Sequence, residues 1–289
     1  MIASREIDAL FQLIDDPDTE VYSTVCHRIV EIGKGIIPNL EHLWENTINP
    51  DVQVRIEQLI HRLHYQELTN DFTNWKKGSQ DLLEGALLVA RYHYPELDKA
   101  DVLKELERMR RSIWLELSQY LTPLEQANVF SSIVFNYHKL RGVETGYEHP
   151  EEFLINKTLE AKKGNGISNG IIYLILAELL DVQVRAVRIP KQFILAHFEQ
   201  QYELSGEHPQ IANRILFYID PLNGQIYSQK DVDAYFTRMN IPPAPAYFRA
   251  QNSKSVIIQL LDEFAKCFDN DLNHYKLDEL RQLQALLQA

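Results

Sequence analysis

One uninterrupted stretch, residues 152–197, constrains the fold of this chain more than any other part of it. A glycine turn, Gly164-Asn165-Gly166, precedes a run at residues 168–180 whose apolar side chains fall on every side of a helix. A valine-rich run at residues 183–188 follows and is typical of a strand. A helix that is apolar all round is buried rather than half exposed. We therefore expect a core helix that leads directly into a sheet.

The elements around this stretch predict an α+β fold. Four candidate strands follow the core helix, at residues 183–188, 193–199, 214–220 and 225–228. A polar connection at 200–213 and the hairpin signal Asn223-Gly224 separate the later strands. Repeated strand–helix–strand patterning is lacking, so the sheet is expected to be small and mainly antiparallel. It should pack on the helix at 168–180, with helical regions at both ends of the chain.

Helices are expected on both sides of this core. Thr122 and Glu125 form a capping box with Pro123 at the first helical position. Apolar spacing and stop signals predict helices at residues 6–14, 19–32, 38–46, 51–65, 79–94, 98–120, 123–140, 152–162, 229–239, 253–268 and 272–288. The last helix carries leucines at helical spacing, which favours a stripe that faces the core over a dimer seam.

The first 65 residues contain an internal repeat with a spacing of 33 residues. Asp16-Pro17-Asp18 recurs as Asn49-Pro50-Asp51, and the four helices around them resemble two HEAT-type helix pairs. Because two repeats alone do not bury their faces, they should dock on the rest of the chain. We therefore predict three parts, which are HEAT-like repeats at 1–68, a sheet domain with a helical lead-in at 79–240, and a C-terminal helical pair at 247–289.

Four short motifs in the sheet domain identify a family in combination. They are Leu154, Ile155 and Asn156 with Leu159, Glu160 and Gly164, then Ile167-Ser168, then Pro190 with Phe193, and last Asp220-Pro221. The region that carries them, about residues 128–227, resembles the transglutaminase-like superfamily, most closely its bacterial SirB-type branch. The resemblance implies a papain-like core with a small antiparallel sheet on a central helix.

The resemblance also implies where a catalytic site would lie. In the superfamily a Cys at the start of the central helix attacks an acyl carbon, a His on the next strand is its base, and an Asp on the strand after orients the His. The equivalent places here are 166–168, Gln192 and Asp220, so the Asp alone is kept. A glutamine cannot accept and return a proton, and a serine hydroxyl needs a positioned base. We therefore interpret Ser168, Gln192 and Asp220 as a vestigial site and assign no catalytic residue.

Two details of this site follow from geometry. His197 lies five residues from Gln192 and should point to the opposite face of its strand unless a bulge intervenes, so it is not expected to replace the missing base. If the family geometry persists, the Gln192 amide donates to Asp220 and accepts from Ser168, and Gln192→Leu should destabilise the fold. Asp220 has an alternative role, which is to close the Asp-Pro turn.

Other side chains indicate no further chemistry. Cys26 and Cys267 lie outside the motifs at opposite ends of the chain, and we interpret them as small buried residues. Glu57, His61 and His64 share one helix face and could ligate a metal. The pattern indicates no further ligand from another segment, so an exposed polar stripe is the better interpretation. We assign neither a metal nor a cofactor.

Charge and hydropathy exclude two classes of partner. The chain carries 29 Lys plus Arg against 41 Asp plus Glu, a net charge of −12, which repels nucleic acid and anionic membranes. Its longest apolar run, residues 171–177, is far shorter than the ~20 residues of a membrane-spanning helix. The N-terminus lacks the pattern of a secretory signal. A soluble, cytoplasmic protein is expected.

Three functional hypotheses remain. The first is a catalytically inactive transglutaminase-like protein, a binding or scaffold module that holds a protein or peptide through its helical repeats or its vestigial cleft. The second is a hydrolase or acyltransferase that uses Ser168 with Asp220 and an unidentified base. The third is a purely structural or regulatory helical-repeat protein. A histidine nitrogen within hydrogen-bond reach of Ser168 would favour the second.

Overall fold

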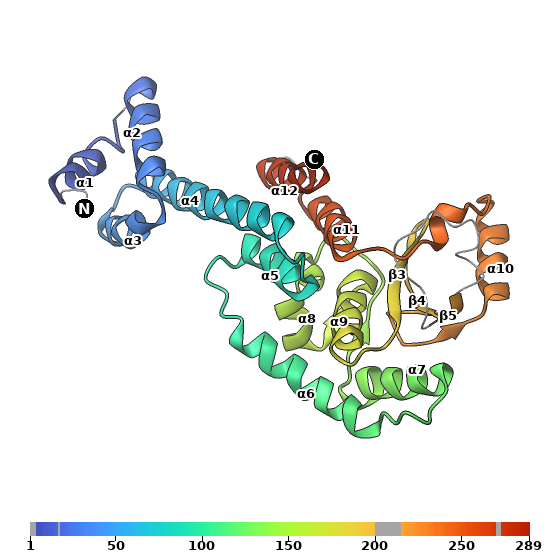
Figure 1. Ribbon diagram of the computed structural model, residues 1–289. Coiled ribbons are helices and arrows are strands. Elements are labelled where there is room, and N and C mark those ends of the chain that lie inside the picture. The colour runs from blue at the N-terminus through green and yellow to red at the C-terminus, as the bar shows by residue number, and fades with distance from the viewer. Residues whose placement is uncertain (1–3, 17, 200–214, 270–272) are drawn as a thin grey trace. The chain divides into compact units, whose positions relative to one another are not determined.

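The chain forms two compact units, Met1–Phe72 and Thr73–Ala289 (Figure 1). A computed structural model describes residues 4–16, 18–199, 215–269 and 273–289. The predicted connection at 200–213 therefore lies outside the described residues. The boundaries predicted at residues 68, 79, 240 and 247 stay a prediction.

The first unit consists of helices, as predicted. They are α1 (Ser4–Phe11), α2 (Thr19–Ile32), a 3₁₀ turn (Lys34–Ile36), α3 (Ile37–Asn46) and the beginning of α4 (Pro50–Lys77). Asp18 caps α2 by accepting the Glu20 N–H at 2.8 Å, and Gly33 ends α2 with a φ of 82° that favours glycine. Ile14, Ile29 and Leu40 are among the side chains of its core. Whether the two helix pairs are HEAT repeats stays a prediction.

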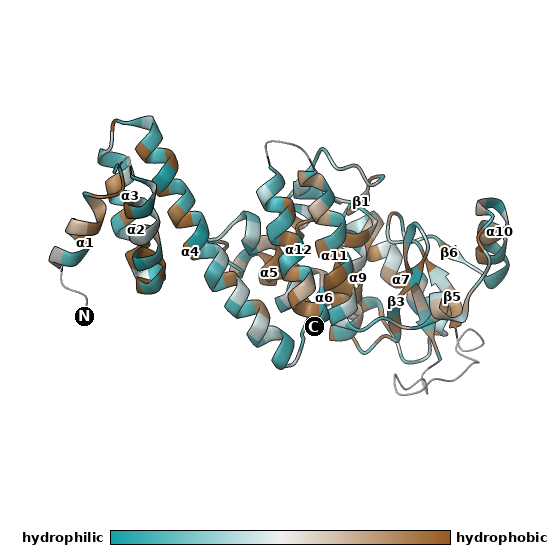
Figure 2. Cartoon of the chain, turned by 90° about the horizontal axis from the view of Figure 1, so that it is seen from above, coloured by the Kyte–Doolittle hydropathy of each residue, from teal (hydrophilic) through white to brown (hydrophobic). Residues whose placement is uncertain are grey.

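Helix α4 is longer than the predicted helix at 51–65. It continues to Lys77 because no glycine or proline occurs between Pro50 and Gly78. Hydrophilic and hydrophobic residues alternate along it (Figure 2), and Leu68, Phe72 and Trp75 on its later turns are buried.

The second unit begins with a helical lead-in. Its helices are α5 (Leu82–His93), α6 (Ala100–Glu116), α7 (Pro123–Ser131) and α8 (Ile155–Ala161). The predicted capping box of Thr122 and Glu125 is present at α7. The predicted helix at 123–140 changes to a π-helix over Ser132–Tyr137, and the one at 152–162 begins as a 3₁₀ turn, Pro150–Phe153.

The central helix of the unit is α9 (Gly166–Leu179), which starts two residues earlier than predicted. Asn165 caps it by accepting the N–H groups of Ile167 and Ser168 at 3.0 and 3.1 Å. Every residue from 167 to 177 is buried, in agreement with the apolar pattern. Helix α9 contacts β3 and β4 on one side and α5, α6 and α8 elsewhere.

The main sheet is antiparallel, in the order β3-β4-β5-β6. Its strands are β3 (Val184–Ile189), β4 (Gln192–Phe198), β5 (Ile215–Ile219) and β6 (Ile226–Tyr227). A two-residue parallel pair, β1 (Arg141–Gly142) with β2 (Lys163–Gly164), was not predicted. Helix α10 (Gln229–Met239) and the 3₁₀ turn Pro245–Phe248 form a second core with the sheet around Ala196, Tyr218 and Phe236. The α+β fold with a small antiparallel sheet on a central helix is therefore confirmed.

The C-terminal helices belong to the same unit. Helix α11 (Ser253–Ala265) continues as a 3₁₀ turn (Lys266–Phe268) and contacts α5 and α9, while α12 (His274–Gln288) packs on α11. The leucines at helical spacing on α12 are all buried, namely Leu277, Leu280, Leu283 and Leu287. In the part of the chain that the structure describes, no helix has the length and apolarity needed to cross a membrane.

Candidate functional site

A cavity of about 860 Å³ lies at the place where the sequence motifs predicted a vestigial site. The start of α9 forms one wall with Gly166 and Ile167, and the β3–β4 hairpin with Gln192 and the turn with Asp220 form two more. Residues 144–147 and the end of α11 complete it. We call this cavity the cleft. The structure brings Gln192 and Asp220 to it, but Ser168 is not among its lining residues.

The Ser168 hydroxyl is buried, and its hydrogen-bond partners are backbone carbonyl groups. Its Oγ donates to the carbonyl oxygen of Glu152 at 2.7 Å and lies 3.3 Å from that of Asn165. No histidine nitrogen of the described residues forms a hydrogen bond with it. A hydroxyl whose proton is held by a carbonyl and that has no base beside it is not an activated nucleophile.

The turn before α9 explains this position. Gly164 lies so close to the helix that an added Cβ would stand 2.5 Å from Ser168 Oγ, so the glycine lets Ser168 pack inward. Glu152, whose carbonyl accepts the hydroxyl, is itself buried and ion-paired with Lys163 at 2.6 Å. The motif residues therefore build a turn around the serine.

Asp220 closes a turn, as one of the two sequence interpretations proposed. Its Oδ1 accepts the Leu222 N–H at 2.8 Å, and its carbonyl accepts the Gly224 N–H at 2.8 Å. Tyr227 Oη lies 3.5 Å from the other carboxylate oxygen. Burial first, and then the Asp220 charge, raise the pKa of Tyr227. One oxygen of this carboxylate is therefore held in the turn by the Leu222 N–H.

Gln192 does not bridge the other two residues. It is exposed as the first residue of β4, and among the described residues no hydrogen bond of its side chain reaches Ser168 or Asp220. The predicted polar cluster is therefore wrong, because Ser168 turns to a carbonyl and Asp220 to its own turn. Of the three positions that correspond to the catalytic triad, two line the cleft, with the amide of Gln192 and the carboxylate of Asp220.

The far wall of the cleft carries polar residues that motif analysis missed. Tyr147 Oη donates to Glu263 at 2.8 Å, and Lys266 pairs with Glu263 at 2.7 Å. Burial raises the pKa of Tyr147, and its hydrogen bond to Glu263 adds to the rise. Burial alone would lower the pKa of Lys266, but Glu263 and Asp262 outweigh it and raise that pKa. Tyr147 and Glu263 are 116 positions apart, so no local pattern signals the pair.

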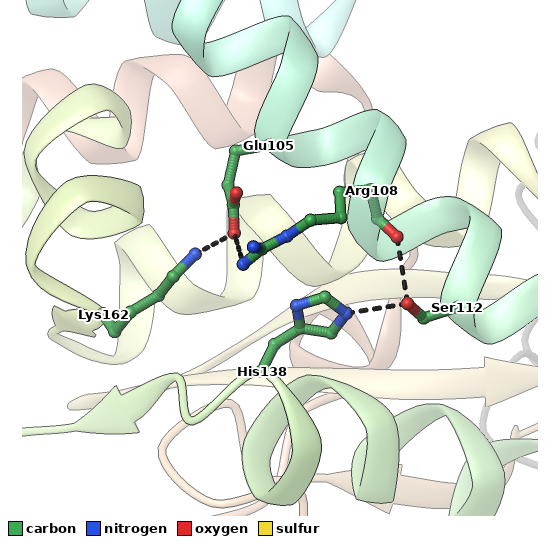
Figure 3. Close-up of polar contacts among 5 residues, drawn as sticks. All are labelled: Glu105, Arg108, Ser112, His138 and Lys162. Atoms are coloured by element: carbon green, nitrogen blue, oxygen red, sulfur yellow. Dashed lines mark hydrogen bonds and ion pairs between the residues drawn. The ribbon is translucent and has the colours of Figure 1, made fainter.

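A serine–histidine hydrogen bond does occur outside the cleft (Figure 3). His138 Nε2 lies 3.1 Å from Ser112 Oγ. The same hydroxyl donates to the Arg108 carbonyl at 3.1 Å, an arrangement in which the imidazole Nε2–H donates to the serine oxygen and does not serve as its base. Burial first, and then the Arg108 charge, lower the pKa of His138. Beside the pair, Glu105 binds Lys162 and Arg108, and the group joins α6 to the segments after the π-helix and α8.

The cysteines lie away from the cleft. Cys26 is buried in the first unit, and burial raises the pKa of the half-buried Cys267 to about 12. Neither thiol lines the cleft, and Cys267 stays protonated near neutral pH. Within residues 4–16, 18–199, 215–269 and 273–289, no group of three His, Cys, Asp or Glu side chains could hold a metal ion.

Comparison with known proteins identifies the family. The chain is 24% identical over 182 residues to a UPF0162 protein of Vibrio cholerae, a match that covers 62% of this chain and 63% of the relative. It is 26% identical over 212 residues to the UPF0162 protein YchA of Escherichia coli K12, which covers 72% and 73% of the two chains. Protein SirB1 of Salmonella typhimurium is 26% identical over 188 residues, 63% of this chain and 64% of its own.

The matches are partial. The chain spans less than two thirds of the Vibrio and Salmonella relatives, and no solved structure matches. A sequence model described as "Transglutaminase-like superfamily" matches residues 100–262, more than half of the 289 residues. The protein therefore belongs to the transglutaminase-like superfamily, in a SirB-type family with SirB1 and YchA.

Proposed function

We propose that this protein is a non-catalytic member of its superfamily, a binding or scaffold module whose cleft holds an extended peptide segment of a partner protein. One observation carries the proposal. The cavity is present at about 860 Å³, but the serine at the start of α9 donates to the Glu152 carbonyl at 2.7 Å instead of facing the cavity.

The lining of the cleft supports binding over acyl transfer. Acyl transfer needs a nucleophile and a base in hydrogen-bond contact, and among the described lining residues there is no thiol or imidazole. The wall instead offers an amide at Gln192, a hydroxyl at Tyr147 and aromatic rings at Phe193 and Tyr247. Charged side chains, among them Arg188, Lys191 and Asp262, also line the cleft, and an extended peptide presents the donors and acceptors that such polar groups bind.

A cleft-filling variant tests the proposal. Gln192→Trp should leave folding unchanged, because Gln192 is exposed, but should narrow the cleft. The matched control is Lys230→Trp, at an exposed position on α10 outside the cleft. Fluorescence polarisation with a panel of short fluorescein-labelled peptides would measure binding. We expect some peptides to bind the parent chain and the control, and to lose affinity for Gln192→Trp.

Other outcomes would point to the remaining hypotheses. Peptide binding that survives Gln192→Trp but is lost without residues 1–72 would assign the partner site to the helical repeats. Ester or amide hydrolysis that disappears in Ser168→Ala would favour a hydrolase and overturn the proposal. No peptide binding by the parent chain would also contradict it.

A further inference from the structure

A second cavity, of about 660 Å³, lies at the other end of β4. It is enclosed by the end of α6, the segment 117–126, the end of α9, and strands β4 and β5. Among the described residues, none lines both this cavity and the cleft. We call it the His197 cavity after the titratable side chain of β4 that borders it.

Three large apolar side chains on the rim of the His197 cavity are exposed, among polar lining residues such as Gln119 and Gln126. Trp114 on α6 is 62% exposed, Leu179 on α9 is 51% exposed, and Leu216 on β5 is 44% exposed. Each of these side chains would gain from burial at roughly 25 cal/mol for each Å² of apolar surface removed from water. Large exposed apolar side chains that gather around one concavity mark binding sites more often than chance placement does.

His197 is the unexplained polar group of this cavity. The side chain is only 4% exposed, and among the described residues neither ring nitrogen has a hydrogen-bond partner. Its ring centre lies 5.0 Å from that of Phe217. The register between β4 and β5 shifts between His197 and Phe198, and such bulges redirect side chains near functional sites. A buried imidazole without partners is costly to keep unless it has a use.

The charged residues around the cavity disfavour an anionic ligand, since the exposed Asp181 also lines it. Arg110 is the one cationic side chain among the described lining residues, and Glu107 holds its guanidinium through two hydrogen bonds, at 2.7 and 2.9 Å. Burial lowers the pKa of His197 by more than the neighbouring Phe198 backbone raises it, so the imidazole is neutral at pH 7. A neutral imidazole supplies one donor and one acceptor.

We propose that the His197 cavity binds a neutral, planar aromatic molecule that carries one amide or similar polar group. The ring packs on Trp114 and the leucines of the rim, and the polar group pairs with a nitrogen of His197 after a rotation of the imidazole. A volume of about 660 Å³ lies within the range of ordinary small-molecule sites. The proposal is independent of the cleft and of what the cleft binds.

Benzamide is a suitable probe, because it combines an aromatic ring with a neutral donor and acceptor. We expect millimolar benzamide to shift the imidazole resonances of His197 and the indole resonance of Trp114 in NMR spectra of the full chain. Benzoate, which has the same ring with a negative charge, and toluene, which lacks the polar group, should each bind at least roughly tenfold more weakly.

Variants separate the site from the fold. His197→Phe keeps an aromatic ring beside Phe217 and should weaken benzamide binding by roughly tenfold or more without affecting toluene. Trp114→Ala, at an exposed rim position, should weaken all three probes, while Gln192→Trp in the cleft should change none. The proposal is overturned if saturating benzamide leaves the His197 resonances unmoved, or if His197→Phe binds benzamide as the parent does.

Discussion

At the scale of single residues, the direction of one hydroxyl decides what the cleft can do. Ser168 sits in the first turn of the central helix, near the place of the superfamily's nucleophile, yet its proton goes to the Glu152 carbonyl at 2.7 Å. In this position the hydroxyl stabilises the turn before α9. A structural serine and a catalytic serine respond differently to removal of the oxygen atom, and this difference can be measured.

We therefore expect Ser168→Ala to destabilise the chain by about 1 kcal/mol, because the Glu152 carbonyl loses its donor at 2.7 Å and keeps the Asn165 N–H at 3.4 Å. Gln192→Leu serves as the control at the second triad place. It should change the free energy of unfolding by less than about 0.5 kcal/mol, because Gln192 is exposed. Urea unfolding measures both. Equal stability of Ser168→Ala and the parent would contradict the structural role.

Substitution of His197 is expected to raise the stability of the chain, in contrast to Ser168→Ala. Replacing its imidazole by the phenyl ring of His197→Phe should stabilise the chain at pH 7 by about 1 kcal/mol or more, since a buried polar group without a partner costs about 1 to 3 kcal/mol. Such a gain with a loss of benzamide binding would be the usual trade between stability and function. A destabilised variant would mean that His197 has a polar partner in the native state.

The same variant should flatten the dependence of stability on pH. The folded pKa of His197 lies below its unfolded value of about 6.5, so its contribution is fully present above that pH and is lost as pH falls towards the folded pKa. The pKa values of His93 and His138 are also lowered, but both histidines are present in the parent and in His197→Phe, so their effect cancels in the comparison. Thermal melts should therefore show that, between about pH 8 and about pH 5, the melting temperature falls less for His197→Phe than for the parent.

The sequence predicted the role of a residue only where that role depends on neighbouring residues in the chain. The turn role of Asp220 was one of two interpretations, because Asp-Pro followed by Asn223-Gly224 is a turn signal, and the Leu222 N–H bond supports it. The Gln192 bridge was wrong because it required the side-chain directions of three separate elements. The orphaned nitrogens of His197 depend on the packing of β4 against β5 and α9, which no sequence pattern specifies.

At the scale of elements, apolar periodicity predicted most helices and strands. Helices α2 and α10 have their predicted bounds, Thr19–Ile32 and Gln229–Met239, since each starts after a capping residue and ends at Gly33 or Asn240. The prediction failed where the chain stays helical but changes its hydrogen bonding, as in the π-helix Ser132–Tyr137. It also missed the β1–β2 pair, whose two-residue strands are too short to show alternation.

The contact between α9 and β4 depends on one glycine. An added Cβ at Gly170 would lie 2.8 Å from Cδ1 of Phe193 and 3.3 Å from Cβ of Pro221. We expect Gly170→Ala to destabilise the chain by about 1 to 3 kcal/mol through overpacking, despite the better helix propensity of alanine. Chemical denaturation measures the change.

Gly166, four residues earlier on the same helix, provides the matched control. A Cβ there would make ordinary contacts at 3.8 Å with Leu222 and 3.9 Å with Pro221. Gly166→Ala should therefore be neutral or slightly stabilising, since alanine favours the helix. If both variants have the same stability, the close packing of α9 on the sheet is not what restricts Gly170.

At the scale of the whole molecule, the cleft is built from segments that are distant in the sequence. The motifs located the start of α9, the hairpin and the Asp220 turn, which form three walls. The remaining walls come from residues 144–147 and from α11, joined by the Tyr147–Glu263 hydrogen bond. Because α11 was assigned to a separate C-terminal pair, its part in the cleft was not anticipated.

The boundary between the two units lies within α4, and this leads to a prediction about fragments. A fragment of residues 73–289 retains Trp75, which is buried, packs against Gly85 and donates from Nε1 to the Asp81 carbonyl at 2.7 Å. It also retains Lys76, whose Nζ donates to the Leu286 carbonyl at 3.0 Å. We expect this fragment to fold cooperatively and to bind benzamide as the full chain does.

A fragment that starts at residue 79, where the sequence placed the domain boundary, lacks both side chains. Loss of a buried tryptophan costs about 3 to 5 kcal/mol in comparable sites, because apolar contacts disappear and a cavity remains. Residues 79–289 should therefore melt well below residues 73–289, by circular dichroism under the same conditions. Equal melting temperatures would mean that the later turns of α4 contribute nothing to the second unit and that residue 79 is its true beginning.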